Sequence, residues 1–205
     1  MGLNGGQKKE KMAKKSTTTA ELSRTSHWLL SRRGPAFCDP IFRWGDQSIK
    51  RIEPFIERKQ IVVDLGCGWG HYSFEIADIV GSGGKVYSID LAPKVISAIL
   101  KKAKKRGYHN IEAYAASAAD LSFINDRSVD FVFANGLLCS MAVDRQSAVA
   151  EIKRILNPAG HAYISLGGTP PWGYVNEAEW DLIVQGFIVE KGGSYKDKWA
   201  LVSLK

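Results

Sequence analysis

Cysteine is scarce in this sequence, and long apolar runs are missing from it. Its 205 residues include three cysteines, Cys38, Cys67 and Cys139, with no C-x-x-C pair, so we expect neither a disulfide framework nor a bound metal. No apolar stretch approaches the roughly 20 residues of a membrane-spanning helix, and the lysine-rich start lacks the apolar core of a secretory signal. These absences exclude a disulfide-rich secreted scaffold and a membrane-spanning protein, and they favour a cytoplasmic one.

Acidic residues are in the minority, but the excess positive charge is unevenly spread. The formal net charge is +7, and residues 1–15 account for +4 of it with five lysines and one glutamate. This stretch has too little apolar surface to offset its ordering entropy, so residues 1–19 are predicted to be a disordered basic tail. A tether for nucleic-acid phosphates is the alternative. A second basic cluster, Lys101–Arg106, ends a predicted helix, where the helix dipole favours cations.

After this tail, short apolar runs of strand length alternate with segments of helical periodicity. The predicted strands are Ile61–Leu65, Lys85–Asp90, Ile111–Ala115, Val129–Ala134, His161–Leu166, Phe187–Glu190 and Trp199–Leu204. The predicted helices are Ala20–Arg33, a weaker one capped by Asp46 and disturbed by Pro54, one ending near Val80, one starting at Pro93, Asp144–Leu156, and one with a capping box of Asn176 and Glu179.

This alternation predicts an α/β, doubly wound fold with a seven-stranded, mostly parallel sheet whose last strand is antiparallel. The strand-to-strand link near Gly192 is too short for a parallel crossover. We expect residues 20–58 to form a helical lid and residues 59–205 to form the main domain.

The most informative stretch is Val62–His71, an apolar strand that runs into three alternating glycines and then a helix. Glycine permits a tight turn and lets a ligand approach the backbone where a Cβ atom would collide. Asp90 ends the second strand, where a carboxylate can accept hydrogen bonds from a ribose diol. The sequence therefore predicts a nucleoside cofactor at the carboxyl end of the first strands.

The residue before the turn discriminates between cofactors. Asp64 faces the predicted site, and its charge would disfavour the pyrophosphate of a dinucleotide but not a cationic sulfonium carrying an amino acid. The spacing is G-x-G-x-G and not the G-x-G-x-x-G of dinucleotide sites. A nicotinamide oxidoreductase is therefore kept only as an outside alternative.

From about Gln60 to Lys205 the chain resembles a class I S-adenosylmethionine-dependent methyltransferase. The resemblance is carried by three motifs, Asp64–Gly70, Ser88–Asp90 and Arg154–Gly160 (RILNPAG). In style it is similar to the compact stand-alone enzymes related to ubiquinone and menaquinone C-methyltransferases. It implies S-adenosylmethionine as cofactor and S-adenosylhomocysteine as product.

The resemblance also implies roles for individual residues. Asp64 and the backbone of Gly66, Cys67 and Gly68 would hold the methionine part, Asp90 the ribose, and Leu91 would pack on adenine. Ser117 and Ala118 lie where the family often has an aspartate that contacts the adenine amino group, and Ser117 departs from that pattern. Asn135 would border the sulfonium and the incoming nucleophile.

The acceptor and its chemistry are less constrained by the residues. No general base stands out: His71 follows the turn, whereas Cys139 and Ser140 occupy the place where many small-molecule enzymes have histidines. A lid containing Trp28, Phe37, Phe42 and Trp44 favours a small, partly apolar acceptor. The alternatives are a protein or RNA acceptor, and a cofactor-binding subunit without catalysis of its own.

Overall fold

The computed structural model describes residues 47–139, 145–166, 175–193 and 198–205. Within them one sheet runs in the order β3-β2-β1-β4-β5-β7-β6. Its strands are β1 (Ile61–Leu65), β2 (Lys85–Asp90), β3 (Ile111–Ala115), β4 (Val129–Asn135), β5 (Leu156–Ser165), β6 (Phe187–Gly192) and β7 (Trp199–Leu204). The pairs from β3 to β5 are parallel, and β7 is antiparallel to both β5 and β6. The predicted seven-stranded fold with an antiparallel last strand is therefore confirmed.

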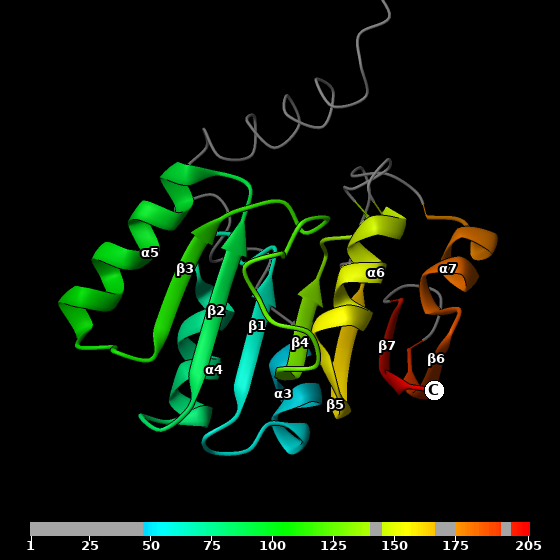
Figure 1. Ribbon diagram of the computed structural model, residues 1–205, viewed down its shortest axis with the longest axis horizontal. Coiled ribbons are helices and arrows are strands. Elements are labelled where there is room, and N and C mark those ends of the chain that lie inside the picture. The colour runs from blue at the N-terminus through cyan, green and yellow to red at the C-terminus, as the bar shows by residue number, and fades with distance from the viewer. Residues whose placement is uncertain (1–46, 140–144, 167–174, 194–197) are drawn as a thin grey trace, which may run out of the picture.

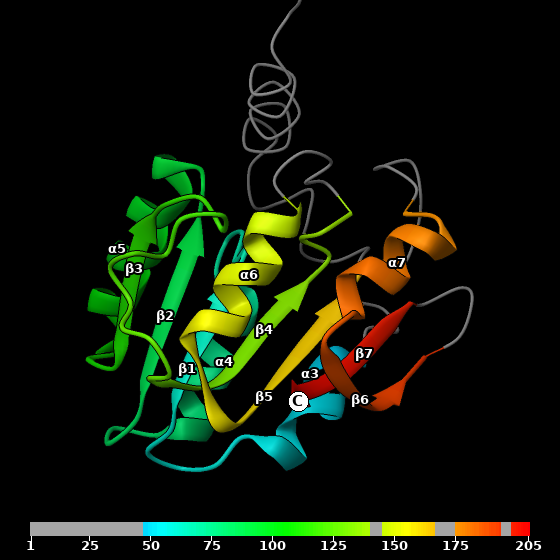
Figure 2. The ribbon, with the colours of Figure 1, turned by 45° about the vertical axis from the view of Figure 1, so that its right-hand side comes forward.

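Helices cover both faces of this sheet, as Figures 1 and 2 show. One face packs against α6 and α7, and the other against α3, α4 and α5. The helices are α3 (Ser48–Ile52), the short 3-10 helix η1 (Glu53–Phe55), α4 (His71–Val80), α5 (Pro93–Arg106), α6 (Arg145–Ile155) and α7 (Glu177–Val184).

Successive side chains of a central strand pack alternately against the helices on the two faces of the sheet. In β1, Val62 packs with the α4 and α5 layer, whereas Val63 packs with the α6 layer, and both are fully buried. A parallel strand that is buried on both faces is apolar at nearly every position. This explains why the strands read as continuous apolar runs, and why a polar residue such as Asp64 inside one of them is conspicuous.

Several element boundaries differ from the sequence predictions. β5 begins at Leu156 instead of His161, because Leu156 pairs with Val129 and a register shift follows before Phe131 pairs with His161. The strand β4 extends to Asn135, and β6 to Gly192. The chain segment Asn157–Gly160 has turn-like composition, which concealed the early start of β5.

Around the lid, only the final part of the predicted segment is described. The α-helix α3 ends at Ile52, and η1 follows with Pro54 in its first turn, so the disturbance expected from this proline is confirmed. The N-cap of α3 is Gln47 and not the predicted Asp46. Outside the described residues lie the predicted basic tail, the helix Ala20–Arg33, Cys38, the four lid aromatics, Ser140 and Asp144.

The strand order has its switch point at β1, in the middle of the sheet. β1 lies between β2 and β4, so the chain continues to β2 on one side of β1 and later returns to β4 on its other side. Ligands of such sheets bind at the carboxyl ends of the strands at this point.

Two further predictions are confirmed: α7 begins with a capping box of Asn176 and Glu179, and the Lys101–Arg106 cluster ends α5. None of the described helices is long and apolar enough to span a membrane.

Candidate functional site

The glycine-rich turn after β1 is anchored on the neighbouring strand. The amide groups of Gly66 and Cys67 both donate to the carbonyl oxygen of Ile89, at 2.8 and 3.0 Å. Gly66 has a φ of +80°, and a Cβ atom there would lie 2.9 Å from Cδ1 of Leu137. Glycine is therefore required at this position by both its backbone conformation and the segment that follows β4.

Asp90 holds the shape of this turn. Its Oδ2 accepts a hydrogen bond from the Gly68 amide at 3.0 Å, and its Oδ1 accepts one from the Ala92 amide at 2.9 Å. The carboxyl group is only 5% exposed. Asp90 thus positions the loop, in addition to the ribose contact that the sequence predicts for it.

Asp64 lies beneath the turn, 2% exposed, and accepts a 2.6 Å hydrogen bond from the hydroxyl of Ser73 in α4. Burial raises the pKa of Asp64 from 3.8 to about 7, with a smaller contribution from the negative charge of Asp90, while the Ser73 hydrogen bond opposes the shift. Ser88 lies opposite Asp64 in the sheet, and its buried hydroxyl has no hydrogen-bond partner among the described residues. The side chains beneath the turn are therefore acidic or polar and almost fully buried.

Two features test whether these residues fit a cationic nucleoside cofactor. A Cβ atom on Gly68 would meet nothing within 4 Å, so the middle of the turn borders open space. Leu91, directly after Asp90, is 41% exposed although it is a large apolar residue. An acidic pair below an open glycine turn, with an apolar side chain beside it, fits a molecule that combines positive charge, a ribose and a flat base.

The remaining predicted contacts lie at the exits of β3 and β4. After β3, the hydroxyl oxygen of Ser117 accepts a hydrogen bond from the amide of Ala119 at 3.2 Å, and Ala118 is buried in the core beside the sheet. Ser117 therefore uses its oxygen for the local loop. At the end of β4, the amide oxygen of Asn135 accepts hydrogen bonds from the hydroxyls of Ser165 and Ser48.

Besides Ser73 and Ser165, the structure adds three residues to this site that the sequence analysis missed. Ser48 and Arg51 of α3 both contact the hydroxyl of Tyr163 in β5, at 3.3 and 3.2 Å. Tyr163 is fully buried and reads in the sequence as one more core aromatic. The only available signal was the spacing of Ser48 and Arg51, which puts them on one face of a helix.

The structure describes the candidate base, His71, and two of the three cysteines, Cys67 and Cys139. His71 is the first residue of α4, with its Nε2 3.4 Å from Oε1 of Glu75 and its ring centroid 4.9 Å from that of Tyr72. Burial raises the pKa of both Cys67 and Cys139, which disfavours the reactive thiolate. In the described ranges no group of three or more histidine, cysteine or acidic side chains is arranged to hold a metal ion.

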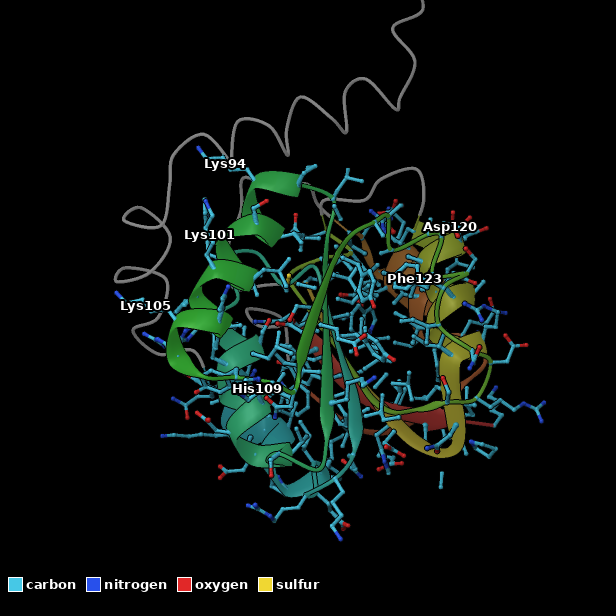
Figure 3. The ribbon with its side chains drawn as sticks, turned by 60° about the vertical axis from the view of Figure 1, so that its left-hand side comes forward. Lys94, Lys101, Lys105, His109, Asp120 and Phe123 are labelled. Carbon is cyan, nitrogen blue, oxygen red and sulfur yellow. The ribbon has the colours of Figure 1, made fainter. Side chains whose placement is uncertain are left out.

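Basic side chains lie along the outer side of α5. Figure 3 shows Lys94, Lys101 and Lys105 on the side of α5 that faces away from the sheet. α5 starts three residues after Asp90 and is 14 residues long, so at about 1.5 Å per residue its basic end lies about 20 Å from the glycine-rich turn.

Comparison with known proteins gives a consistent answer. A family model described as a methyltransferase domain matches residues 56–181, more than half of the chain. Over 118 residues the chain is 27% identical to a demethylmenaquinone methyltransferase from Geobacillus stearothermophilus, which covers 58% of this chain and 49% of that protein. The chain thus spans about half the length of this curated relative.

Solved structures share the fold. The crystal structure of a SAM-dependent methyltransferase from Aquifex aeolicus has a TM-score of 0.70 at 22% identity, covering 87% of this chain and 98% of that one. A Burkholderia thailandensis 1,6-didemethyltoxoflavin-N1-methyltransferase, solved with 1,6-didemethyltoxoflavin and S-adenosylhomocysteine, has a TM-score of 0.68 at 15% identity, covering 91% and 88%. The matched domain, the strand order and the acidic glycine turn together show that this chain belongs to the class I S-adenosylmethionine-dependent methyltransferases.

Proposed function

We propose that this protein transfers a methyl group from S-adenosylmethionine to a small, partly apolar acceptor. The observation that carries the proposal is the pair of buried carboxyl groups, Asp64 and Asp90, below an open glycine turn. When both groups are ionised, such a pair attracts a sulfonium and an ammonium group and repels a pyrophosphate. When bound, the cofactor would supply a methyl group on a positively charged sulfur. An in-line nucleophile would bond to the methyl carbon, and the sulfur would leave with the bonding electron pair.

The chain's own residues then have separate tasks. Asp64 and the backbone of Gly66, Cys67 and Gly68 bind the amino-acid part. Asp90 binds the ribose while it keeps the Gly68 amide in place, at 3.0 Å. These residues fix the orientation of the cofactor, and orientation together with exclusion of water lowers the barrier of a displacement that needs no covalent intermediate.

Three further residues complete the proposed binding surface. The exposed side chain of Leu91 packs on the adenine ring. The loop of Ser117 and Ala118 borders the base, with weaker polar recognition than an aspartate would provide, because the Ser117 hydroxyl oxygen already accepts from Ala119. Of the lid expected over residues 20–58, the structure describes α3, whose Ser48 donates to Asn135.

The matched relative supports a small acceptor over a polymer. The named relative is a demethylmenaquinone methyltransferase, and demethylmenaquinone is a ring compound. We accordingly propose a quinone-type or similar ring acceptor.

A cytoplasmic location belongs to the same proposal. Cys67 and Cys139 are both free thiols, as expected in a reducing compartment.

Calorimetric titration with S-adenosylmethionine, S-adenosylhomocysteine and NADH tests the cofactor. We expect saturable binding of the first two and none of the third; binding of NADH alone would overturn the proposal. Transfer of a labelled methyl group to a prenylated naphthoquinol then tests the acceptor, with 5S ribosomal RNA and a histone mixture as competing acceptors. Label found only in RNA or protein would refute a small-molecule acceptor.

A further inference from the structure

The strand β3 forms one edge of the sheet, and β2 is its one neighbour among the described residues. The Val86 amide donates to the carbonyl oxygen of Asn110, and the Ala116 amide donates to that of Asp90. Because alternate residues of a parallel strand bond to the same neighbour, the even-numbered residues of β3 bond to β2. The odd-numbered residues direct their N–H and C=O groups outward, and these are Ile111, Ala113 and Ala115.

The helix α5 lies on one face of β3 and brings positive charge to this edge. Its 14 residues include six basic and no acidic side chains. Lys102 and Arg106 lie over the Phe74 ring of α4, so that side of α5 faces α4. Residues two positions apart lie about 200° apart around a helix, which puts Leu100 and Lys104 on the opposite side. α5 is the outermost helix of its layer (Figure 1), and both residues are exposed beside the open edge.

Aromatic side chains lie on the other face of the same edge. The ring centroids of Tyr87 and Tyr114 are 6.1 Å apart, and those of Tyr114 and Phe123 are 4.7 Å apart. Residues 116–128, all described, join β3 to β4 without a helix, and Tyr114 and Phe123 remain 37% and 44% exposed. Figure 3 shows β3 between α5 and the loop that carries Phe123. The open edge therefore has a lysine side and an aromatic side.

A ligand that uses both sides of this edge has to reach around it. An added β-strand does so, because its backbone pairs with the outward groups of β3 while successive side chains point to opposite faces. A second copy of the chain, paired through its own β3, would bring its basic α5 against this one. Residues 1–15 of the chain also have the wrong charge, at +4. Charge complementarity thus favours an acidic strand from another protein.

We propose that an extended acidic segment of a partner protein pairs with the outer edge of β3 and becomes the eighth strand of the seven-stranded sheet. Its acidic side chains lie on the α5 side, near Lys104. Its alternate, apolar side chains pack on Tyr114 and Phe123. The partner is therefore recognised by alternation of acidic and apolar residues, and this interaction does not depend on the identity of the methyl acceptor.

Fluorescence anisotropy with the full chain tests the proposal. The probe is a fluorescein-labelled peptide of three Glu-Val repeats. One control peptide has Lys-Val repeats, and another has the same three glutamates and three valines in two blocks. We expect saturable binding of the Glu-Val repeats and much weaker binding of both controls, because only the alternating acidic peptide matches both sides of the edge.

Two N-methylated versions of the probe show whether its backbone pairs with β3. In an antiparallel pair, residues directly opposite each other exchange both hydrogen bonds and share a face. The residue opposite Ala113 then points its side chain to the α5 side, so it is a glutamate. N-methylation of the glutamates should abolish binding, and N-methylation of the valines should preserve it. The reverse result indicates a parallel added strand and supports the proposal equally, whereas equal binding of all three peptides overturns it.

Variants of the protein locate the peptide on it. Lys104→Glu should weaken binding of the Glu-Val peptide about three- to tenfold. Lys205→Glu makes the same change of charge at the exposed C-terminal residue, and it should leave binding unchanged. Ala113→Pro removes one outward N–H group without removing a bond to β2, which an edge strand tolerates. It should abolish binding while the circular dichroism spectrum stays that of the wild type; if this variant does not fold, the N-methylated peptides decide the question.

The remaining outcomes each overturn the proposal. Wild-type protein that does not bind the Glu-Val peptide has no such site. Binding that is lost in Lys104→Glu and kept in folded Ala113→Pro reports charge attraction without strand pairing. Binding of a labelled single-stranded 12-mer of deoxyadenylate, without binding of the peptide, assigns the surface to nucleic acid. A dimer in sedimentation equilibrium that Ala113→Pro dissociates assigns the edge to a second copy of the chain.

Discussion

We expect Asp64→Asn to remove a loss of stability that the wild-type protein undergoes between about pH 4 and pH 7. The carboxyl group of Asp64 is 2% exposed and accepts a 2.6 Å hydrogen bond from Ser73. Burial, aided by the charge of Asp90, raises its pKa from 3.8 to about 7. An asparagine at this position can still accept the Ser73 hydrogen bond but carries no charge at any pH.

The size of this effect follows from proton linkage. Below the unfolded pKa of 3.8, Asp64 is protonated in both states and imposes no penalty. Between that value and a pKa of about 7, the unfolded chain loses the proton while the folded chain keeps it, so the free energy of unfolding falls as pH rises. At about 1.4 kcal/mol per pH unit, the loss approaches about 4 kcal/mol near pH 7, and it stays constant above.

Chemical denaturation at pH 5 and pH 8 measures this loss. The free energy of unfolding of Asp64→Asn relative to wild type should increase by about 3 kcal/mol between the two pH values, because the other titrating groups cancel in the difference. Asp181→Asn, the same change at an exposed position of α7, should show no such increase. A difference between Asp64→Asn and wild type that does not vary with pH would refute the reasoning.

Three other substitutions probe separate parts of the site and its support. Gly66→Ala should lower the free energy of unfolding by about 1–3 kcal/mol, since φ is +80° and Leu137 lies 2.9 Å from the new Cβ atom; an unchanged denaturation midpoint would contradict this. Asp90→Ala should weaken S-adenosylmethionine binding by about 1–3 kcal/mol, and an unaltered Kd by calorimetry would show that Asp90 makes no useful contact. Arg154→Ala should cost about 2–4 kcal/mol of stability, because Arg154 donates to two backbone carbonyl oxygens and bonds Glu151; Arg154→Lys, which keeps the charge but not the fork, should recover only part of this in the same denaturation assay.

The fold could be predicted because its strands are buried on both faces. Runs such as Ile61–Leu65 and Val129–Asn135 are apolar at nearly every position, and the intervening helices have the longer period that distinguishes them. The beginning of β5 could not be predicted, because Asn157–Gly160 has the composition of a turn. Its strand character comes from pairing of Leu156 with Val129, which is a tertiary contact.

Part of the candidate site could likewise be predicted from the sequence, and part of it could not. The glycine turn is visible in the sequence because its backbone conformation and close contacts require glycine at fixed positions. The contacts among Ser48, Asn135 and Tyr163 join residues 87 and 115 positions apart, and neither serine nor tyrosine has a sequence pattern that announces such a partner. The hydrogen bond from Ser73 to Asp64 likewise depends on how α4 packs against β1.

The place of β7 in the sheet has a consequence for synthesis of the protein. β7 lies between β5 and β6, and the only ladder that β6 forms among the described residues is with β7. On the ribosome, β6 is made before its partner exists, and the edge of β5 stays open with its backbone groups unpaired. A nascent or prematurely ended chain therefore exposes two unpaired strand edges that can aggregate. Both edges become paired only when Trp199–Leu204 has been synthesised and inserts between them.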